Sequence, residues 1–247
     1  MCIWPFKPKP PVPVFPEDKT GYTLIFSDDF NSNEPIPGPT YDTCEIYGVN
    51  HTLIGGKPPY IIWKPSQVTQ AKSCVILTND LNNTPGEPGI KAGEICMWPL
   101  LFITYGYVEM RAKVPLNGIK NWFCGWLVGK VWNFEIDFCE MTEPDSTSYS
   151  VTIHQPVNGV DFQLYHKVIQ AKIDLSLDFH IYAVDWQPTY CWFYLDNVLV
   201  AEYIGAMLPI PMYFLADICV KPGYVPDGSL TFPNQAGIDY LKIYKKG

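Results

Sequence analysis

The chain has 247 residues, of which 47% are hydrophobic and only 17% charged, so it can form a sizeable core and is not globally disordered. Aromatic residues reach 15%, and 24 prolines and 18 glycines indicate many turns, which favours a many-stranded β fold over a helical bundle. The net charge is −8, and Arg111 is the only arginine. This balance argues against nucleic acid and against an anionic membrane surface as partners.

The N-terminal segment, residues 1–18, holds six prolines and no apolar stretch of the kind found in a secretory signal. We interpret it as a proline-rich arm that precedes one domain over residues 19–247. No stretch in the sequence is apolar for long enough to predict a membrane-spanning helix.

The eight cysteines include no C-x-x-C pair, and several stand inside apolar runs, as Cys96, Cys124 and Cys219 do. Cysteine in such surroundings behaves as a small hydrophobic residue, so we predict mostly free, buried thiols rather than disulfides. The spacing also gives no indication of a zinc site.

Alternating or continuously apolar runs predict strands, in chain order, at residues 22–26, 75–78, 107–114, 122–128, 181–186, 192–195, 198–200 and 238–244. Asp196 and Asn197 separate two of these runs and indicate a hairpin with a two-residue turn. Short strands at this spacing predict an all-β, single-domain sandwich or jelly roll.

Three carboxylates, Glu135, Asp137 and Glu140, lie within six residues among bulky apolar groups. On a strand, Glu135 and Asp137 point to one face, and Glu140 joins them only if a β-bulge at residues 138–139 adds a residue. Like charges this close raise at least one pKa, so the row does not serve stability. Retaining glycoside hydrolysis needs two such carboxylates, one as nucleophile and one as proton donor. An exposed acidic strand or a cation site is the alternative.

The acidic segment resembles the E-x-D-x-x-E signature of glycoside hydrolase family 16, in its laminarinase-like branch. Further segments are similar to the family's patterns in the same order, namely residues 22–30, 105–115, 121–127, 179–188, 212–220 and 238–244. The resemblance covers nearly everything after the arm. It implies a catalytic domain with a concanavalin A-like jelly roll and a concave substrate cleft. The shorter E-x-D-x-E of lichenases and xyloglucan transferases is not matched, which disfavours those activities.

The same resemblance implies that Glu135 is the nucleophile, that Glu140 is the general acid/base, and that Asp137 hydrogen-bonds the nucleophile. It also implies that Trp126 forms an aromatic floor for the sugar, a role that suits the apolar C–H face of a pyranose. Core packing is the alternative for any such tryptophan. Three further tryptophans are candidate substrate contacts, and they are Trp122, Trp132 and Trp186.

Two other polar residues are candidate substrate contacts. Several bulged members of the family carry a histidine at the position of His154, beside the acid/base, although a satisfied polar group is the alternative. Arg111 either orients an acid or a substrate hydroxyl, or forms a cross-strand ion pair. Asp29 and Asp239 fall where members often hold a structural calcium, and carboxylate oxygens suit that ion.

We therefore expect an endo-acting, retaining hydrolase of a β-linked polysaccharide, with a β-1,3-glucan of laminarin type as the leading substrate. A marine-galactan hydrolase acting on agar, porphyran or carrageenan is one alternative, and a non-catalytic lectin on the same fold is another. Catalysis requires no cofactor, and calcium would be structural. The expected partner is polysaccharide, with neither nucleic acid nor membrane, and the expected state is a monomer. An extracellular or virion-associated location is expected, although no signal peptide is visible.

Overall fold

The computed structural model describes residues 19–31, 61–71, 73–84, 89–116, 118–129, 134–157, 160–220 and 232–247. The predicted arm, residues 1–18, and the candidate Trp132 lie outside these residues. The described part of the chain contains fifteen β-strands and two 3-10 helices, η1 (Pro65–Gln67) and η2 (Gly118–Asn121). No helix in these ranges is long and apolar enough to cross a membrane.

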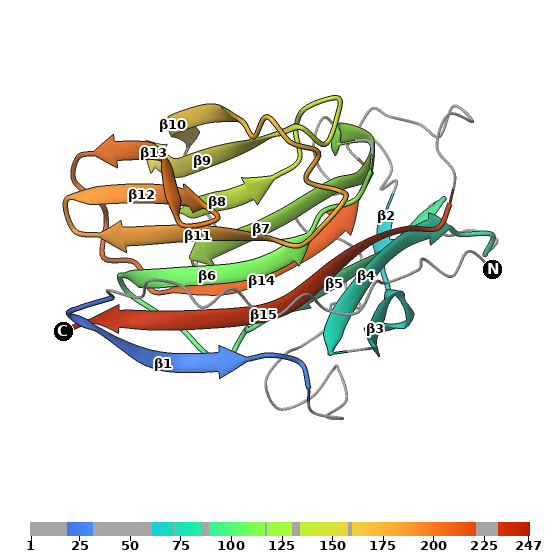
Figure 1. The fold of residues 1–247 in the computed structure, drawn as a ribbon, viewed down its shortest axis with the longest axis horizontal. Helices are drawn as coiled ribbons and strands as arrows, with labels where there is room; N and C mark the ends of the chain where they lie inside the picture. Colours follow the sequence, from blue (N-terminus) through green and yellow to red (C-terminus); the bar gives the residue numbers. More distant parts are fainter. Residues whose placement is uncertain are drawn as a thin grey trace.

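The strands form two layers of one sheet that turns back on itself, and every pairing except that of β2 with β5 is antiparallel (Figure 1). The β7–β8 layer contains, in order, β10 (Val160–Gln170), β9 (Ser148–Val157), β8 (Glu135–Glu140), β7 (Trp122–Gly129), β14 (Met212–Cys219) and β5 (Ile90–Cys96). The β6–β15 layer continues with β4 (Cys74–Leu81), β15 (Asn234–Lys246), β6 (Gly106–Lys113), β11 (His180–Gln187), β12 (Tyr190–Leu195) and β13 (Val198–Ile204). The predicted all-β jelly roll is confirmed.

Three shorter pairings complete the layers. Strand β1 (Tyr22–Asp28) pairs with β15, and β3 (Val68–Ala71) pairs with β4. Strand β2 (Ile61–Trp63) runs parallel to β5. Strands β4 and β5 pair with each other over two residues and so connect the layers at one edge.

The main core lies between the two layers, because alternate residues of each strand point inward. In and next to β8, the predicted inward residues Phe134, Ile136 and Phe138 are all fully buried in this core. Val108 and Met110 reach the same core from β6 in the other layer. The acidic residues of β8 therefore belong to the face that points away from the core.

The predicted hairpin connects β12 and β13. Asp196 and Asn197 have φ angles of 48° and 65°, which is the left-handed pair that a two-residue type I′ turn requires. Nδ1 of His180 lies 2.8 Å from Oδ2 of Asp196, so this histidine ties the start of β11 to the turn.

Trp186 is in the core and not at a binding surface. It is fully buried in β11, and its ring packs 4.9 Å from that of Tyr105 and 6.3 Å from that of Phe134. The prediction that Trp186 contacts substrate is therefore wrong, because the side chain points inward and fills the space between the layers.

Arg111 likewise has a structural partner. Its Nη1 lies 2.5 Å from Oδ2 of Asp239, and both side chains are buried, on β6 and β15 of the layer that lacks the acidic strand. Asp239 stands at an irregularity in the pairing of β15 with β6, between Ile238 and Tyr240. Of the two alternatives for Arg111, the ion pair is the one the molecule uses, and the substrate role is wrong.

The six cysteines within the described ranges are all free and buried, as predicted, and they are Cys74, Cys96, Cys124, Cys139, Cys191 and Cys219.

Candidate active site

A β-bulge in β8 places the three acidic residues on one face. Asp137 and Cys139 pair with consecutive residues of β7, so Phe138 is the extra residue. Phe138 and Cys139 are both fully buried in the core, which returns Glu140 to the face that carries Glu135 and Asp137. The bulge predicted from the spacing of the three acids is confirmed.

The neighbouring strand is shaped to receive this bulge. A Cβ atom at Gly125 of β7 would lie 2.5 Å from Cε of Met110 and 3.5 Å from Cζ of Phe138. Any side chain at this position would therefore displace Met110 in the core opposite the bulge. The glycine in the middle of an otherwise bulky strand is explained by this close approach.

A pocket with an empty volume of about 390 Å³ lies on the acidic face. It is lined by Trp122, Cys124 and Trp126 of β7, by Glu135, Asp137 and Glu140 of β8, and by Asp217 and Cys219 of β14. Four of these eight residues are carboxylates, and none of the described lining residues is basic. The strand pairing thus brings five predicted site residues into one pocket, and they are Trp122, Trp126, Glu135, Asp137 and Glu140.

Two indole groups of β7 hold carboxylates on the neighbouring strands. Trp122 donates its Nε1–H to Oε1 of Glu140 at 3.0 Å. Trp126, which is only 4% exposed, donates its Nε1–H to Oδ2 of Asp217 at 2.9 Å. Both hydrogen bonds are charge-assisted when the carboxylate is ionised, so they fix the orientation of the acid as well as that of the ring.

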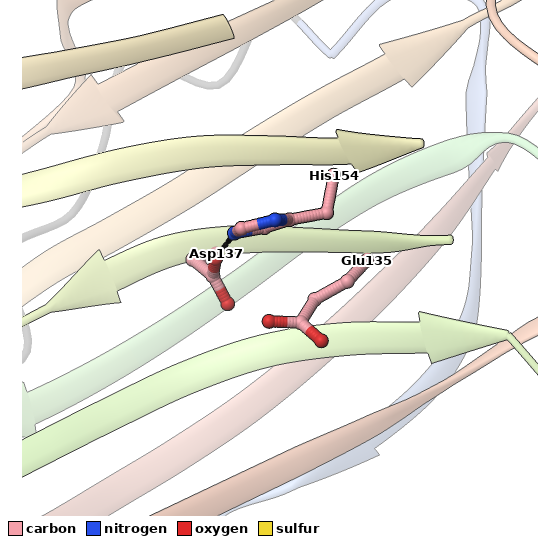
Figure 2. A group of neighbouring side chains, drawn as sticks. All are labelled: Glu135, Asp137 and His154. Carbon is pink, nitrogen blue, oxygen red and sulfur yellow. Dashed lines mark ion pairs between the residues drawn. The ribbon is translucent and has the colours of Figure 1, made fainter. Parts of the chain in front are cut away.

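Asp137 lies at the centre of the acidic group and is 2% exposed. It shares a hydrogen bond with Glu135, and its Oδ2 lies 3.5 Å from Nε2 of His154 on β9. Figure 2 shows the carboxylate of Glu135 and the ring of His154 directed toward Asp137. Burial, and then the charges of Glu135 and Glu140, raise the pKa of Asp137 well above its ordinary value. This raised pKa makes Asp137 the acid of the row that gives up its proton less readily than an ordinary aspartate does.

Asp137 also contacts the thiol group of Cys124. Its Sγ lies 3.7 Å from Oδ1 of the carboxyl group. Burial, and then the charge of Asp137, raise the pKa of this thiol well above its ordinary value, so the sulfur keeps its proton and can donate it. That hydrogen bond favours the ionised carboxyl and partly offsets the effects that raise the pKa of Asp137.

His154 lies beside Glu135 rather than beside Glu140, the residue next to which the family resemblance placed it. The pairing of β9 with β8 places His154 opposite Glu135 and Ser150 opposite Glu140. Donor atoms of Glu135, Asp137 and His154 all lie within 4.8 Å of one another, which among the described residues is the one group of three such donors. The hydrogen bond between Glu135 and Asp137 is one of the causes that raise the pKa of Asp137.

Asp217 is a pocket residue that the sequence analysis did not single out. It is 7% exposed on β14 and stands opposite Glu94 of β5, which is also buried. Burial, and then the charge of Glu94, raise the pKa of Asp217 well above its ordinary value. In the sequence, Asp217 could have been recognised as a candidate because it is the one acidic residue in the apolar run of residues 212–220.

The two candidate calcium ligands have other partners. The carboxylate of Asp239 is neutralised by Arg111, and the exposed carboxylate of Asp29 accepts a hydrogen bond from the side chain of Asn31. Calcium at these residues stays a prediction, and the guanidinium group already supplies the positive charge at Asp239.

The sequence model of the family described as glycosyl hydrolases family 16 matches residues 61–212 of this chain. The β-glucanase of Acetivibrio thermocellus is 32% identical over 195 residues, which are 75% of this chain and 55% of that protein. The keratan-sulfate endo-1,4-β-galactosidase of Sphingobacterium multivorum is 28% identical over 248 residues, which are 92% of this chain and 56% of that protein. The chain thus spans about half the length of these curated relatives.

Solved structures share the fold at lower identity. The catalytic domain of an endo-1,3-β-glucanase (laminarinase) from Thermotoga petrophila superposes with a TM-score of 0.75 at 22% identity, over 91% of this chain and 98% of that one. The κ-carrageenase of Pseudoalteromonas carrageenovora gives a TM-score of 0.73 at 16% identity, over 96% of this chain and 100% of that one. The family inferred from the acidic strand and the family matched over most of the chain agree, and the chain belongs to glycosyl hydrolase family 16.

Proposed function

We propose that this chain is a retaining endo-hydrolase of a neutral β-linked glucan, with a β-1,3-glucan of laminarin type as its substrate. The observation that carries the proposal is the bulge in β8, which sets Glu135, Asp137 and Glu140 side by side in one pocket. A lectin on the same fold has no need of three carboxylates whose mutual repulsion must be offset by hydrogen bonds.

In the first chemical step, the carboxylate of Glu135 attacks the anomeric carbon of the bound sugar. The bond from that carbon to the glycosidic oxygen breaks, and Glu140 gives its proton to the departing oxygen. In the second step, Glu140 takes a proton from a water molecule, the resulting hydroxide attacks the anomeric carbon, and Glu135 leaves as a carboxylate. The anomeric configuration is inverted twice and so is retained.

The neighbours of the two carboxylates support these roles. Asp137 has a raised pKa and is hydrogen-bonded to Glu135, so its carboxyl group is placed to stabilise the nucleophile's charge when the covalent bond to the sugar breaks. The indole N–H of Trp122 holds the carboxyl group of Glu140 in the pocket, at 3.0 Å. Both contacts position the reacting groups before substrate arrives, which lowers the cost of reaching the transition state.

The charge of the pocket supports a neutral substrate over a sulfated galactan. Four carboxylates line it, and the sole arginine, Arg111, is buried in the other layer with Asp239. A sulfate group placed among these acids would be repelled and would find no guanidinium partner among the described lining residues. The similarity to a β-glucanase and to a laminarinase also favours a glucan as the substrate. Because a keratan-sulfate galactosidase and a κ-carrageenase are also similar to this chain, galactans have to be tested beside glucans as substrates.

The test is release of reducing ends from a panel of laminarin, mixed-linkage β-glucan, agarose, κ-carrageenan and keratan sulfate. We expect cleavage of laminarin, with internal oligosaccharides rather than single sugars as the first products. Cleavage of a sulfated galactan in preference to laminarin would refute the glucan assignment.

Proton NMR of the first product tests the stereochemistry on the same samples. Retaining enzymes have carboxyl groups about 5–5.5 Å apart, which leaves no room for a water molecule on the far side of the sugar. The β-anomer should therefore appear first and relax to the equilibrium mixture later. An α-anomer appearing first would show that Glu135 is not the nucleophile.

A further inference from the structure

A second aromatic group lies beside the catalytic pocket. Trp98 follows β5, Phe102 stands in the loop after it, and Tyr213 is the second residue of β14. The ring centroids of Trp98 lie 5.3 Å from Phe102 and 5.5 Å from Tyr213, and those of Phe102 and Tyr213 are 5.9 Å apart. These three mutually contacting side chains are here called the aromatic platform.

The platform lies on the same face as the catalytic carboxylates. Tyr213 and Asp217 are four residues apart on β14, so their side chains point to the same side of the strand. Asp217 lines the pocket, whereas Phe214 and Ala216 between them are buried in the core. Tyr213 is therefore directed to the pocket side.

The platform is also continuous with the pocket wall. Trp98 and Tyr213 pack against a buried cluster that contains Trp126. Tyr213 pairs with Val128, and Val128 pairs with Glu135 on the next strand. Two strand spacings separate the backbones of Tyr213 and Glu135, a distance of about 10 Å. A polymer that reaches Glu135 can thus place a neighbouring sugar over the platform.

The three side chains are partly exposed and uncharged, on a face whose pocket is rich in acids. Partly exposed aromatic surface next to a pocket with polar groups is typical of a ligand-binding surface. Aromatic faces suit β-linked glucose, because its equatorial hydroxyl groups leave C–H bonds on both faces of the ring. The axial 4-hydroxyl of galactose would interrupt one of those faces.

We propose that the aromatic platform is an additional sugar subsite, which holds a glucose unit of the polymer beyond the units joined by the bond that is cleaved. The proposal rests on the proposed function, because it assigns the platform to the same polysaccharide chain. It predicts that long oligosaccharides gain affinity from the platform and that short ones, which cannot reach it, do not.

The experiment measures binding and hydrolysis of β-1,3-linked glucose oligosaccharides, from the disaccharide to the heptasaccharide. Binding is measured by calorimetry in the Glu135→Gln background, and hydrolysis in the otherwise native chain. Trp98→Ala and Tyr213→Ala should each weaken binding of the longest oligosaccharides about tenfold and raise KM for them by a similar factor. The kcat on those substrates and the affinity for the shortest ones should not change.

Two sets of variants separate binding from folding. Trp98→Phe and Tyr213→Phe keep an aromatic face and should retain most of the affinity. Trp192→Ala removes a partly exposed tryptophan that stacks on Tyr190 in the other layer, at 4.2 Å, and should leave affinity for every oligosaccharide unchanged. Melting temperatures of all variants are recorded alongside.

Two results would overturn the subsite. One is native affinity of Trp98→Ala and Tyr213→Ala for the longest oligosaccharides, and the other is an equal loss for short and long ones. If the native chain cleaves another polymer of the panel instead of laminarin, the proposed substrate is wrong. The same variants are then compared on oligosaccharides of the polymer that is cleaved. A native chain that cleaves none of the panel overturns both the function and the subsite.

Discussion

A hydrogen bond joins Trp122 of β7 to Glu140 of β8, in which the indole Nε1–H donates to Oε1 of the carboxyl group at 3.0 Å. The same carboxyl group is the proposed proton donor to the departing sugar. An aromatic residue of the pocket wall thus positions the acid/base, in addition to any contact that it makes with substrate.

Trp122→Phe tests this positioning, because phenylalanine keeps an aromatic ring and removes the N–H donor. A hydrogen bond to a charged group contributes about 1.5–3 kcal/mol, so we expect kcat to fall by at least about tenfold with KM changed less. Steady-state kinetics on the cleaved polysaccharide measure both parameters. An unchanged kcat would mean that Glu140 is held by other contacts.

Glu135→Gln and Glu140→Gln should each reduce kcat by at least about a hundredfold, because an amide can neither attack the anomeric carbon nor exchange a proton. Circular dichroism and melting curves should show an intact fold. Glu202→Gln is the matched control, since Glu202 is exposed on β13 of the other layer, and it should keep native turnover. Near-native turnover of either pocket variant would disprove its assigned role.

Asp217→Asn should change how stability depends on pH. The folded state raises the pKa of Asp217 above its unfolded value of about 3.9, so it binds the proton more tightly than the unfolded chain does. This contribution to stability is complete below about pH 4 and is lost as pH rises toward the folded pKa. Asparagine is neutral and can still accept the hydrogen bond from Trp126.

We therefore expect the stability of Asp217→Asn relative to the native chain to increase through that pH range. The gain should reach about 1 kcal/mol or more in mildly alkaline solution. Urea unfolding at a series of pH values measures it. A stability difference that is flat with pH would show that Asp217 has the same proton affinity in the folded and unfolded states.

Arg111→Met should destabilise the fold without affecting catalysis. Removing one partner of a buried ion pair leaves the carboxylate of Asp239 uncompensated, which costs about 3–5 kcal/mol. The double variant with Asp239→Asn should recover part of that loss. Urea unfolding gives the stability, and kcat per folded molecule should stay native, because the pair lies in the layer without the pocket. A lower kcat with native stability would indicate that Arg111 acts in the active site.

A chelator experiment on the native chain addresses the predicted calcium at Asp29 and Asp239. Bound structural calcium would raise the melting temperature, and its removal by EDTA would lower it. If EDTA has no effect on melting, the Arg111 guanidinium is sufficient as the counter-charge of Asp239.

Much of the active strand could be read from the sequence, because its determinants are local. The alternation of Phe134, Ile136 and Phe138 with acids sets which side of β8 enters the core. The three-residue step from Asp137 to Glu140 requires a bulge for both to share a face, and the pairing with β7 has it. The turn at Asp196 and Asn197 is equally local, since few residue types adopt two positive φ angles.

The partners of these residues were decided by the tertiary structure, because strand pairing joins positions far apart in the chain. Trp126 is hydrogen-bonded to Asp217, which lies 91 residues further along the chain, and Arg111 is paired with Asp239, which lies 128 residues further along. Whether a tryptophan such as Trp186 fills the core or faces a pocket depends on which layer its strand joins and on which side it points. Those are properties of the whole sandwich, and a single strand's sequence does not contain them.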